Sequence, residues 1–301
     1  MTAQDPGARP DWIAVDWGTS HLRVWPMRGG TPLTRLQSDR GMGQLSPDTF
    51  EATLVSLLGD WLAGIENRLP VLVCGMAGAR QGWREAPYAA VPCTPPVTGV
   101  PVETVDPRLA VTILPGLSQT QPADVMRGEE TQIGGFLRGT PGFDGVICLP
   151  GTHTKWAHVS AQEVVSFRTF MTGELFALLS KQSVLRFSMG EGWDDAAFGD
   201  AVGDAMARPA TLAADLFGLR AATLLEGLSP GAAKARLSGL LIGVELAGAR
   251  PYWLGQEIVI LGEDGMAGAY RDALVAQGAQ VRCVPVDDMT LAGLIAAREK
   301  T

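Results

Sequence analysis

Two short segments combine glycine, hydroxyl side chains and charge in the way that a phosphate-binding turn requires. The first is Asp16-Trp17-Gly18-Thr19-Ser20, which contains the end of the apolar run at 12–16. Backbone N–H groups and small hydroxyls in such a turn can hold phosphate oxygens, and the Asp16 carboxylate can hold Mg²⁺ directly or through water. The competing interpretation is a hairpin turn in which Asp16 only caps the backbone.

The second segment, Pro150-Gly151-Thr152-His153-Thr154-Lys155, follows another apolar run and offers the same glycine and hydroxyl chemistry. Its candidate phosphate-binding residues are Gly151, Thr152, His153, Thr154 and Lys155. For a single segment, His153 and Lys155 would be read as solvated loop residues. The matching position of the two turns favours a shared function, with Thr19 and Thr154 on opposite walls of one crevice.

A third candidate lies at Gly262-Glu263-Asp264-Gly265, after the apolar run at 257–261. Gly262 and Gly265 would let the backbone approach an adenine or ribose closely. The segment lacks the GxGxxG spacing, so a Rossmann dinucleotide site is not supported. An ordinary strand-to-helix turn is the alternative.

The elements that carry these turns alternate between strand and helix. Apolar runs at 12–16 and 70–76 predict strands, and a helix is predicted between them at 47–65. Residues 21–27 alternate with period two and predict a hairpin with the first run. Segment 146–160 repeats this pattern. The alternation favours an α/β fold.

The remaining segments extend the same organisation. Short strands are predicted at 102–105 and 110–116, and a loop at 118–124. Helices are predicted at 126–139, 167–185, 195–228, 232–249 and 269–278, with a strand at 257–262. The glycine-rich break at 139–145 divides the chain into expected domains 1–143 and 144–301.

Composition excludes several functional classes. The 301 residues are 46% hydrophobic and carry a formal net charge of −8 without a basic, aromatic-bearing window, so no nucleic-acid partner is expected. The four cysteines are widely spaced, which favours free thiols over zinc or disulfides. Because no secretory leader or apolar run of about 18 residues occurs, we expect a cytoplasmic protein without a membrane partner. The sequence does not decide between a monomer and a homodimer.

In this order, the three turns resemble those of the sugar kinase, Hsp70 and actin superfamily. Within it, the sequence is similar to the 2-dehydro-3-deoxygalactonokinase family. The strings that carry the resemblance are DWGTSHLR at 16–23, RGMGQL at 40–45, CGMAGARQGW at 74–83, ILPGLSQ at 113–119, DVMRGEETQIGG at 124–135, LPGTHTKW at 149–156 and TFMTGELF at 169–176, with weaker matches in ARLSGLLIGVELAG and VILGEDGMAGAY. They span most of the first 180 residues.

The resemblance implies two ribonuclease H-like domains, an actin/hexokinase-like ATPase fold, around an interdomain cleft. It implies ATP and Mg²⁺ as cofactors and transfer of the γ-phosphoryl group to the terminal (6-) hydroxyl of 2-dehydro-3-deoxy-D-galactonate. Many superfamily members place an acidic residue at the second turn, where this chain has Pro150. Metal binding should therefore depend on Asp16 and water.

The base that deprotonates the acceptor hydroxyl is expected at the start of helix 126–139, where related kinases and phosphatases place a catalytic acid. Glu130 is the candidate, with Glu129 beside it and Asp124 as an outside alternative. Consecutive helical residues point about 100° apart, so one of the two glutamates should face the cleft. The alternative is that both only complement the helix dipole.

A sugar acid needs a partner for its carboxylate, and arginine suits it by bidentate geometry. Arg80 is the first candidate, with Arg23 and Arg127 as alternatives. The polar, glycine-bearing interruptions GARQGW and FMTGEL contribute the further sugar-site candidates Gln81, Trp83, Thr172 and Glu174. For Thr172, a helix N-cap is the competing role.

Two other functions use similar residues. A phosphohydrolase of the same superfamily, acting on polyphosphate or a guanosine polyphosphate, would release phosphate without a sugar acceptor. A non-catalytic sugar or nucleotide sensor would usually add a DNA-binding helix-turn-helix, for which the residues before Trp12 are too few. The sequence does not distinguish the epimers of the sugar acid.

Overall fold

The computed structural model describes residues 9–262 and 264–300, which form two compact units. In the described chain, the first unit comprises 9–143, 161–165 and 286–300, and the second comprises 144–160 and 166–285. The division after residue 143 coincides with the expected domain boundary. Residues 161–165 and 286–300, expected in the C-terminal domain, group with the first unit. The reason is that α9 (Val286–Arg298) packs against α2 (Glu129–Gly139) and β1 (Trp12–Trp17).

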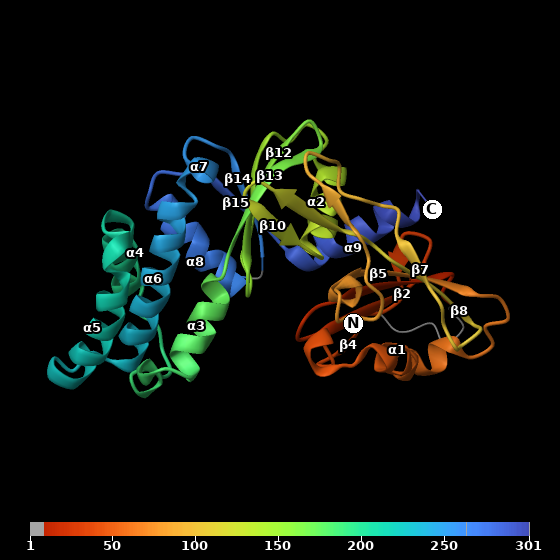
Figure 1. The fold of residues 1–301 in the computed structure, drawn as a ribbon, viewed down its shortest axis with the longest axis horizontal. Helices are drawn as coiled ribbons and strands as arrows, with labels where there is room; N and C mark the ends of the chain where they lie inside the picture. Colours follow the sequence, from red (N-terminus) through yellow and green to blue (C-terminus); the bar gives the residue numbers. More distant parts are fainter. Residues whose placement is uncertain (1–8, 263, 301) are drawn as a thin grey trace. The chain divides into compact units, whose positions relative to one another are not determined.

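The first unit is built on a seven-stranded mixed sheet (Figure 1). Its strand order is β3-β2-β1-β5-β8-β7, and β4 also pairs with β2. The bounds of these strands after β1 are β2 (Leu22–Arg28), β3 (Thr31–Pro32), β4 (Leu36–Ser38), β5 (Leu69–Gly75), β7 (Val100–Val102) and β8 (Leu109–Ile113). β1 and β2 form the predicted antiparallel hairpin, and β5 and β8 continue parallel to β1.

The two faces of this sheet are buried by different helices, because successive side chains of a strand point to opposite faces. Ile13, Val15 and Trp17 of β1 cluster with α1 (Phe50–Leu58), whereas Trp12 and Ala14 cluster with α9. Asp16 follows Trp12 and Ala14 in the alternation. The strand therefore presents a carboxylate at its end on the α9 side. Short 3-10 turns occupy Met42–Gln44, Pro47–Thr49, Gly59–Leu62 and Met76–Gly78.

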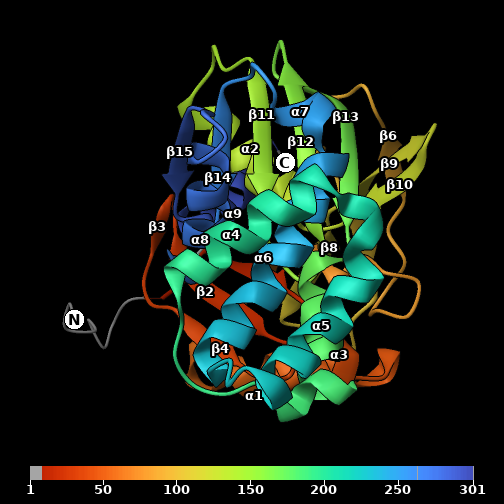
Figure 2. The ribbon, with the colours of Figure 1, turned by 90° about the vertical axis from the view of Figure 1, so that its left-hand side faces the viewer.

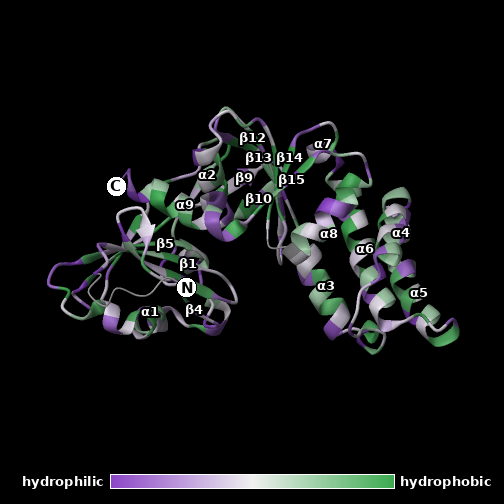
Figure 3. Cartoon of the chain, turned by 180° about the vertical axis from the view of Figure 1, so that it is seen from behind, coloured by the Kyte–Doolittle hydropathy of each residue, from purple (hydrophilic) through white to green (hydrophobic). Residues whose placement is uncertain are grey.

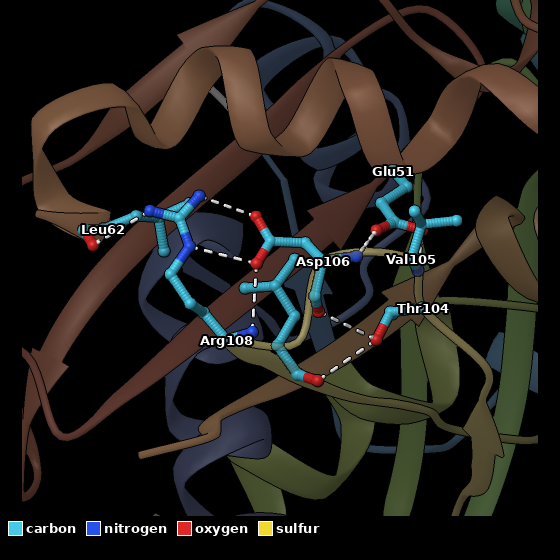
Figure 4. Close-up of polar contacts among 7 residues, drawn as sticks. Glu51, Leu62, Thr104, Val105, Asp106 and Arg108 are labelled. Atoms are coloured by element: carbon cyan, nitrogen blue, oxygen red, sulfur yellow. Dashed lines mark hydrogen bonds and ion pairs between the residues drawn. The ribbon is translucent and has the colours of Figure 1, made fainter. Parts of the chain in front are cut away.

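The loop before β8 is fixed by a polar cluster (Figure 4). Asp106 accepts hydrogen bonds from Nε and Nη2 of Arg108 at 3.0 and 2.6 Å, and Arg108 Nη1 donates to the carbonyl of Leu62. Glu51 of α1 accepts from the backbone N–H groups of Val105 and Asp106. These contacts hold the loop to α1 and to the turn that follows α1. The loop precedes β8, whereas Asp16 lies at the opposite end of the parallel strands.

A smaller three-stranded sheet, ordered β10-β9-β6, completes the first unit. Its strands are β6 (Tyr88–Ala90), β9 (Gly116–Thr120) and β10 (Ala123–Met126). The prediction of a loop at 118–124 is wrong, since Ser118, Gln119 and Thr120 pair with β10 in an antiparallel hairpin. Polar side chains and Pro122 indicated a loop, but the backbone of this half-buried or exposed segment is paired as a strand hairpin.

The second unit contains a five-stranded sheet of order β13-β12-β11-β14-β15, except for the first residues of β13, which group with the first unit. The strands are β11 (Gly145–Leu149), β12 (Thr154–Ser160), β13 (Glu163–Phe170), β14 (Ile258–Leu261) and β15 (Val281–Val284). β11 and β12 form the second predicted hairpin, while β14 and β15 run parallel to β11. The order repeats that of the first unit, where an antiparallel hairpin is also extended by two parallel strands. The prediction of two similar core topologies is confirmed.

Helices cover this sheet and form a helical layer (Figure 2). They are α3 (Thr172–Lys181), α4 (Asp195–Ala207), α5 (Leu212–Leu225), α6 (Pro230–Gly248), α7 (Arg250–Trp253) and α8 (Asp264–Val275), with 3-10 turns at Val184–Phe187 and Pro209–Thr211. Both α4 and α5 pack on α6, and hydrophobic residues mark much of these three helices (Figure 3). The helix predicted at 167–185 begins only at Thr172, because residues 167–170 continue β13.

None of the helices in the described residues has the length and apolar character needed to cross a membrane.

Candidate active site

Asp16 lies at the end of β1 with its side chain buried. It pairs across the hairpin with Arg23 of β2, whose Nη1 donates to Oδ2 at 3.0 Å. Burial raises the pKa of the Asp16 carboxyl, and the Arg23 guanidinium opposes that rise. The expected substrate ligand Arg23 is thus engaged with Asp16, and it also approaches Asp287 at 3.5 Å.

The first phosphate turn is exposed at its tip and supported from behind. Thr19 and Ser20 are exposed, whereas Gly18 donates its N–H to the carbonyl of His21 at 2.9 Å. The segment 41–43 backs the turn through bonds from the N–H groups of Met42 and Gly43 to Gly18 and Thr19. The two hydroxyls predicted to bind phosphate therefore project from a fixed backbone.

The start of α2 meets the ends of β1 and β5 through two glycines. Gly75 has φ +86° and Gly128 has φ +106°, a conformation that side chains other than glycine rarely adopt. A Cβ at Gly128 would lie 3.3 Å from Gly75 Cα, and one at Gly75 would lie 3.3 Å from Asp16 Oδ1. This close backbone contact brings the acidic first turn of α2 to the carboxylate of β1.

Glu130, in that first turn, is fully buried. Its Oε2 accepts from the N–H of Gly128 at 2.7 Å and its Oε1 accepts from Thr131 Oγ1 at 3.2 Å. Burial, with Glu129 adding to it, raises the pKa of Glu130 to about 8, while the backbone donors and Arg127 oppose the rise. A carboxyl that titrates near neutrality suits proton transfer.

Cys74 lies between these two carboxylates. Its Sγ donates to Asp16 Oδ1 at 3.8 Å, and burial, with Asp16 and Glu130 beside it, raises the pKa of the thiol well above its usual value. The thiol therefore stays protonated and adds no negative charge. Glu129 is half-buried and accepts from the backbone N–H of Arg127 at 3.1 Å. Asp124 lies on β10 and accepts from the N–H of Val125.

The loop after β5 holds three of the predicted sugar-binding residues. Arg80 is 80% exposed at its side chain and its Nε lies 3.5 Å from Glu85 Oε1. Gln81 is also exposed. Trp83 is half-buried and packs its ring against Phe50 and Trp17, with centroids 6.2 and 6.0 Å away. Arg80 and Gln81 are exposed where a ligand could reach them, whereas Trp83 also supports the core.

Arg127, the alternative carboxylate ligand, is buried beside the same loop. Its Nη2 donates to the carbonyl of Ala86 at 2.8 Å and its guanidinium lies 4.3 Å from the ring centroid of Tyr88. Among the described residues, its Nε and Nη1 have no hydrogen-bond partner.

In the second unit, the phosphate turn at 150–154 packs against the start of α3. The N–H of Glu174 donates to the carbonyl of Thr152 at 2.9 Å, and Glu174 Oε2 lies 2.6 Å from His153 Nε2. A Cβ at Gly173 would clash with the carbonyl oxygen of Gly151, so only glycine permits this approach. Glu174, predicted for the sugar site, thus contacts the second phosphate turn.

The last residues of this turn face inward. Thr154 is fully buried, and its Oγ1 lies 2.9 Å from the hydroxyl of Tyr270. Lys155 is buried and donates from Nζ to the carbonyl of His153 at 3.0 Å. Thr152 and His153 are exposed. Of the side chains predicted to bind phosphate here, only these two project outward.

A cavity of about 250 Å³ lies beside the turn in the second unit. It is lined by Thr172, Gly173, Phe176, Trp193, Lys234, Ser238, Leu241, Ile242, Gly265, Met266, Ala269 and Tyr270. Of the two glycines predicted to bind adenosine, Gly265 lines this cavity. Gly262 directly follows β14, and a Cβ at this position would lie 3.0 Å from Ala267 Cβ. Glu263, between them, lies outside the described residues.

Glu245, which was not among the predicted site residues, is a buried carboxylate on α6 that accepts hydrogen bonds from Trp156, Thr172 and Tyr270. A signal was present, because Glu245 interrupts the apolar run GLLIGVELAG. A charged residue in such a run is seldom buried unless it is paired. Thr172 uses its hydroxyl for this contact.

Within the described chain, no three His, Cys, Asp or Glu side chains gather as a metal site would require. Mg²⁺ differs from metals held by dedicated protein cages, because it usually keeps several waters and takes one or two carboxylates. The single carboxylate of Asp16 fits that ligand requirement.

Comparisons with known proteins identify the family. The sequence model of the 2-keto-3-deoxy-galactonokinase family matches residues 16–297. A Rhizobium meliloti (strain 1021) protein named "Probable 2-dehydro-3-deoxygalactonokinase DgoK1" is 39% identical over 297 residues, which cover 95% of this chain and 96% of that protein. The 2-dehydro-3-deoxygalactonokinase of Escherichia coli (strain K12) is 35% identical over 287 residues, covering 94% and 96%.

Solved structures agree. A Sinorhizobium meliloti protein that carries a 2-dehydro-3-deoxygalactonokinase name superposes with a TM-score of 0.89 at 38% identity, covering 96% of each chain. The (R)-2-hydroxyglutaryl-CoA dehydratase component A of Acidaminococcus fermentans, at 13% identity, has a TM-score of 0.54 over 96% of this chain and 98% of that chain, a likeness of fold alone. The expected actin/hexokinase-like ATPase fold is confirmed. The chain belongs to the 2-keto-3-deoxy-galactonokinase family.

Proposed function

We propose that this chain is a kinase that transfers the γ-phosphoryl group of ATP to the terminal (6-) hydroxyl of 2-dehydro-3-deoxy-D-galactonate. The observation that carries the proposal is the placement of Asp16 and Glu130 at one edge of the first unit's sheet, in a chain matched to the family over residues 16–297. One carboxylate suits metal and phosphate chemistry, and the other suits proton transfer.

The exposed groups of the two turns would bind the phosphates. Thr19 and Ser20 offer hydroxyls in the first turn, and Thr152 and His153 offer side chains in the second. The second-unit cavity lined by Gly265 would receive the adenosine. When bound, Mg²⁺ would neutralise charge on the transferred phosphoryl group. Asp16 would hold it, with Arg23 favouring the ionised state of that carboxyl.

Glu130 would accept the proton of the acceptor hydroxyl as the new O–P bond forms. Its pKa of about 8 makes it a stronger base than an ordinary carboxylate. Glu129 differs from Glu130 because its side chain is the more accessible of the two. Asp124 lies on β10, outside the first turn of α2.

Arg80, Gln81 and Trp83 are proposed to line the sugar site, with the exposed guanidinium of Arg80 available to the substrate carboxylate. Arg23 supports this site through Asp16 rather than as a free cation. Thr172 and Glu174 would act on the nucleotide side, because their polar atoms contact Glu245 and the second turn. An enzyme that uses ATP in this way would act in the cytoplasm, where ATP is available.

A coupled ADP-release assay tests the proposal, with 2-dehydro-3-deoxy-D-galactonate and its gluconate-derived epimer compared side by side. We expect ADP release with the galactonate-derived acid and only background release without an acceptor. Phosphate release that ignores the acceptor would instead support the phosphohydrolase alternative. Transfer to neutral hexoses, or ATP binding without turnover on any sugar acid, would contradict the proposal.

A further inference from the structure

The second unit contains a buried polar cluster centred on Glu245 of α6, which is 2% exposed. Oε1 accepts from the indole Nε1 of Trp156 at 2.7 Å, and Oε2 accepts from the hydroxyl of Tyr270 at 2.7 Å and from Thr172 Oγ1. Three donors from three elements, β12, α8 and α3, converge on one carboxylate. Burying a charge is tolerated when its acceptor oxygens are satisfied in this way.

The cluster extends to the phosphate turn through Tyr270. The tyrosine hydroxyl has one proton, which it donates to Glu245, so the 2.9 Å contact with Thr154 requires Thr154 Oγ1–H to donate to the tyrosine oxygen. The Thr154 proton is then committed to the interior. Its hydroxyl serves the turn as an anchor and does not donate to a phosphate.

Thr172 anchors the other side of the same turn. Its hydroxyl is held by Glu245, and the following residues, Gly173 and Glu174, contact Gly151 and Thr152 of the turn. Thr172 and Tyr270 also line the 250 Å³ cavity. One carboxylate therefore fixes the last residue of the turn, the helix that packs on it and two walls of the neighbouring cavity.

We propose that Glu245, acting through Tyr270 and Thr172, is the positioning residue of the nucleotide site in the second unit. It sets where the exposed groups of the turn lie relative to the adenosine cavity, without contacting ATP. This inference rests on the proposed function, because it assigns the turn and cavity to ATP. If the cluster only stabilised the fold, disrupting it would lower the melting temperature without a selective effect on nucleotide affinity.

Two matched substitutions separate these roles, since each removes one donor to Glu245. Tyr270→Phe breaks the path to Thr154, whereas Trp156→Phe removes the bond to the other carboxylate oxygen, Oε1, and leaves the Tyr270–Thr154 contact in place. We expect Tyr270→Phe to raise the KM for ATP and the Kd for a non-hydrolysable ATP analogue about tenfold, the size of one lost hydrogen bond to a charged group. The KM for the sugar acid should stay within about twofold. Trp156→Phe should lower the melting temperature and leave the KM for ATP unchanged.

Two matched substitutions at Thr154 keep the inference testable if the Tyr270 or Trp156 variant fails to fold. Thr154→Ser retains the anchoring hydroxyl and should bind the analogue like wild type, whereas Thr154→Val, of nearly equal shape, should weaken binding as Tyr270→Phe does. Equal nucleotide affinity in the Ser and Val variants, or equal effects of Tyr270→Phe and Trp156→Phe, would overturn the inference. Because calorimetry with the analogue needs no acceptor, these results stand apart from the sugar-acid assay, whose failure would instead reject the proposed function.

Discussion

Arg23 and Asp16 face each other across the first hairpin, with Nη1 of the arginine 3.0 Å from Oδ2 of the aspartate. Burial disfavours the negative charge of Asp16, and the Arg23 cation stabilises that charge. In the proposed role of Asp16 as the carboxylate that holds Mg²⁺, the arginine would determine how readily that carboxylate ionises.

Asp16→Asn should therefore lower kcat by at least about 100-fold, an effect of the size expected when a key electrostatic group is lost. Activity should also need a higher Mg²⁺ concentration. Titrating kcat against Mg²⁺ for both proteins checks this, with melting temperature as the folding control. A variant that keeps the wild-type Mg²⁺ dependence would show that the metal does not depend on Asp16.

Replacing Arg23 by Gln removes the group that opposes the burial effect, so the pKa of Asp16 should rise further. The carboxylate would then ionise at a higher pH, and the acidic limb of the kcat profile should move to higher pH in Arg23→Gln. Measuring kcat at saturating substrates across the pH range tests this. If the acidic limb of the kcat profile stayed at the wild-type pH, the ionisation of Asp16 would not control that limb.

The raised pKa of Glu130 also predicts a pH-dependent stability difference. Burial raises the folded-state pKa from the usual 4.5 to about 8, so the stability contributed by the protonated group is fully present below about 4.5 and lost as pH rises through about 8. Glu130→Gln cannot ionise and avoids that loss. Its melting temperature relative to wild type should therefore increase between pH 5 and pH 9. A constant difference would mean that Glu130 does not titrate in this window.

Arg80 is expected to recognise the substrate carboxylate. Arg80→Ala should raise the KM for the sugar acid about tenfold or more and leave the KM for ATP unchanged, because a charge-assisted hydrogen bond would be lost. Arg84→Ala, an exposed arginine of the same loop, provides the control. An unchanged sugar KM in Arg80→Ala would exclude this role and direct attention to the buried Arg127.

Glu174 provides a test of which substrate α3 serves. Because its carboxylate contacts His153 and its N–H contacts Thr152, Glu174→Gln should raise the KM for ATP several-fold with little effect on the KM for the sugar acid. Steady-state kinetics with each substrate varied in turn distinguishes the two. An increase in KM for the sugar acid alone would instead assign Glu174 to the sugar site.

The sequence predicted the local chemistry of this protein better than its long-range contacts. Both hairpins, the glycine turns and the acidic start of α2 follow from periodicity and residue type, which act over a few neighbours. The loop predicted at 118–124 and the first residues of the helix predicted at 167–185 were wrong, since these polar or mixed segments became strands through pairing.

Tertiary partners explain what sequence patterns did not predict. Thr154 has the residue type of a phosphate ligand, yet Tyr270, 116 positions later, directs its hydroxyl inward. Glu245 is unusual in an apolar helix, but its three donors come from segments that only the fold brings together. Helix α9 joins the first unit for the same reason, because the face it covers is made by β1 and β5.

The most direct test of the account compares kcat for Glu130→Gln and Glu129→Gln on 2-dehydro-3-deoxy-D-galactonate, with ATP-analogue affinity measured for both. General-base catalysis contributes about 10²–10⁴-fold. We predict that Glu130→Gln loses at least about 100-fold in kcat with unchanged nucleotide affinity, while Glu129→Gln loses less than about tenfold. Near-normal kcat in Glu130→Gln would contradict the assignment of the base.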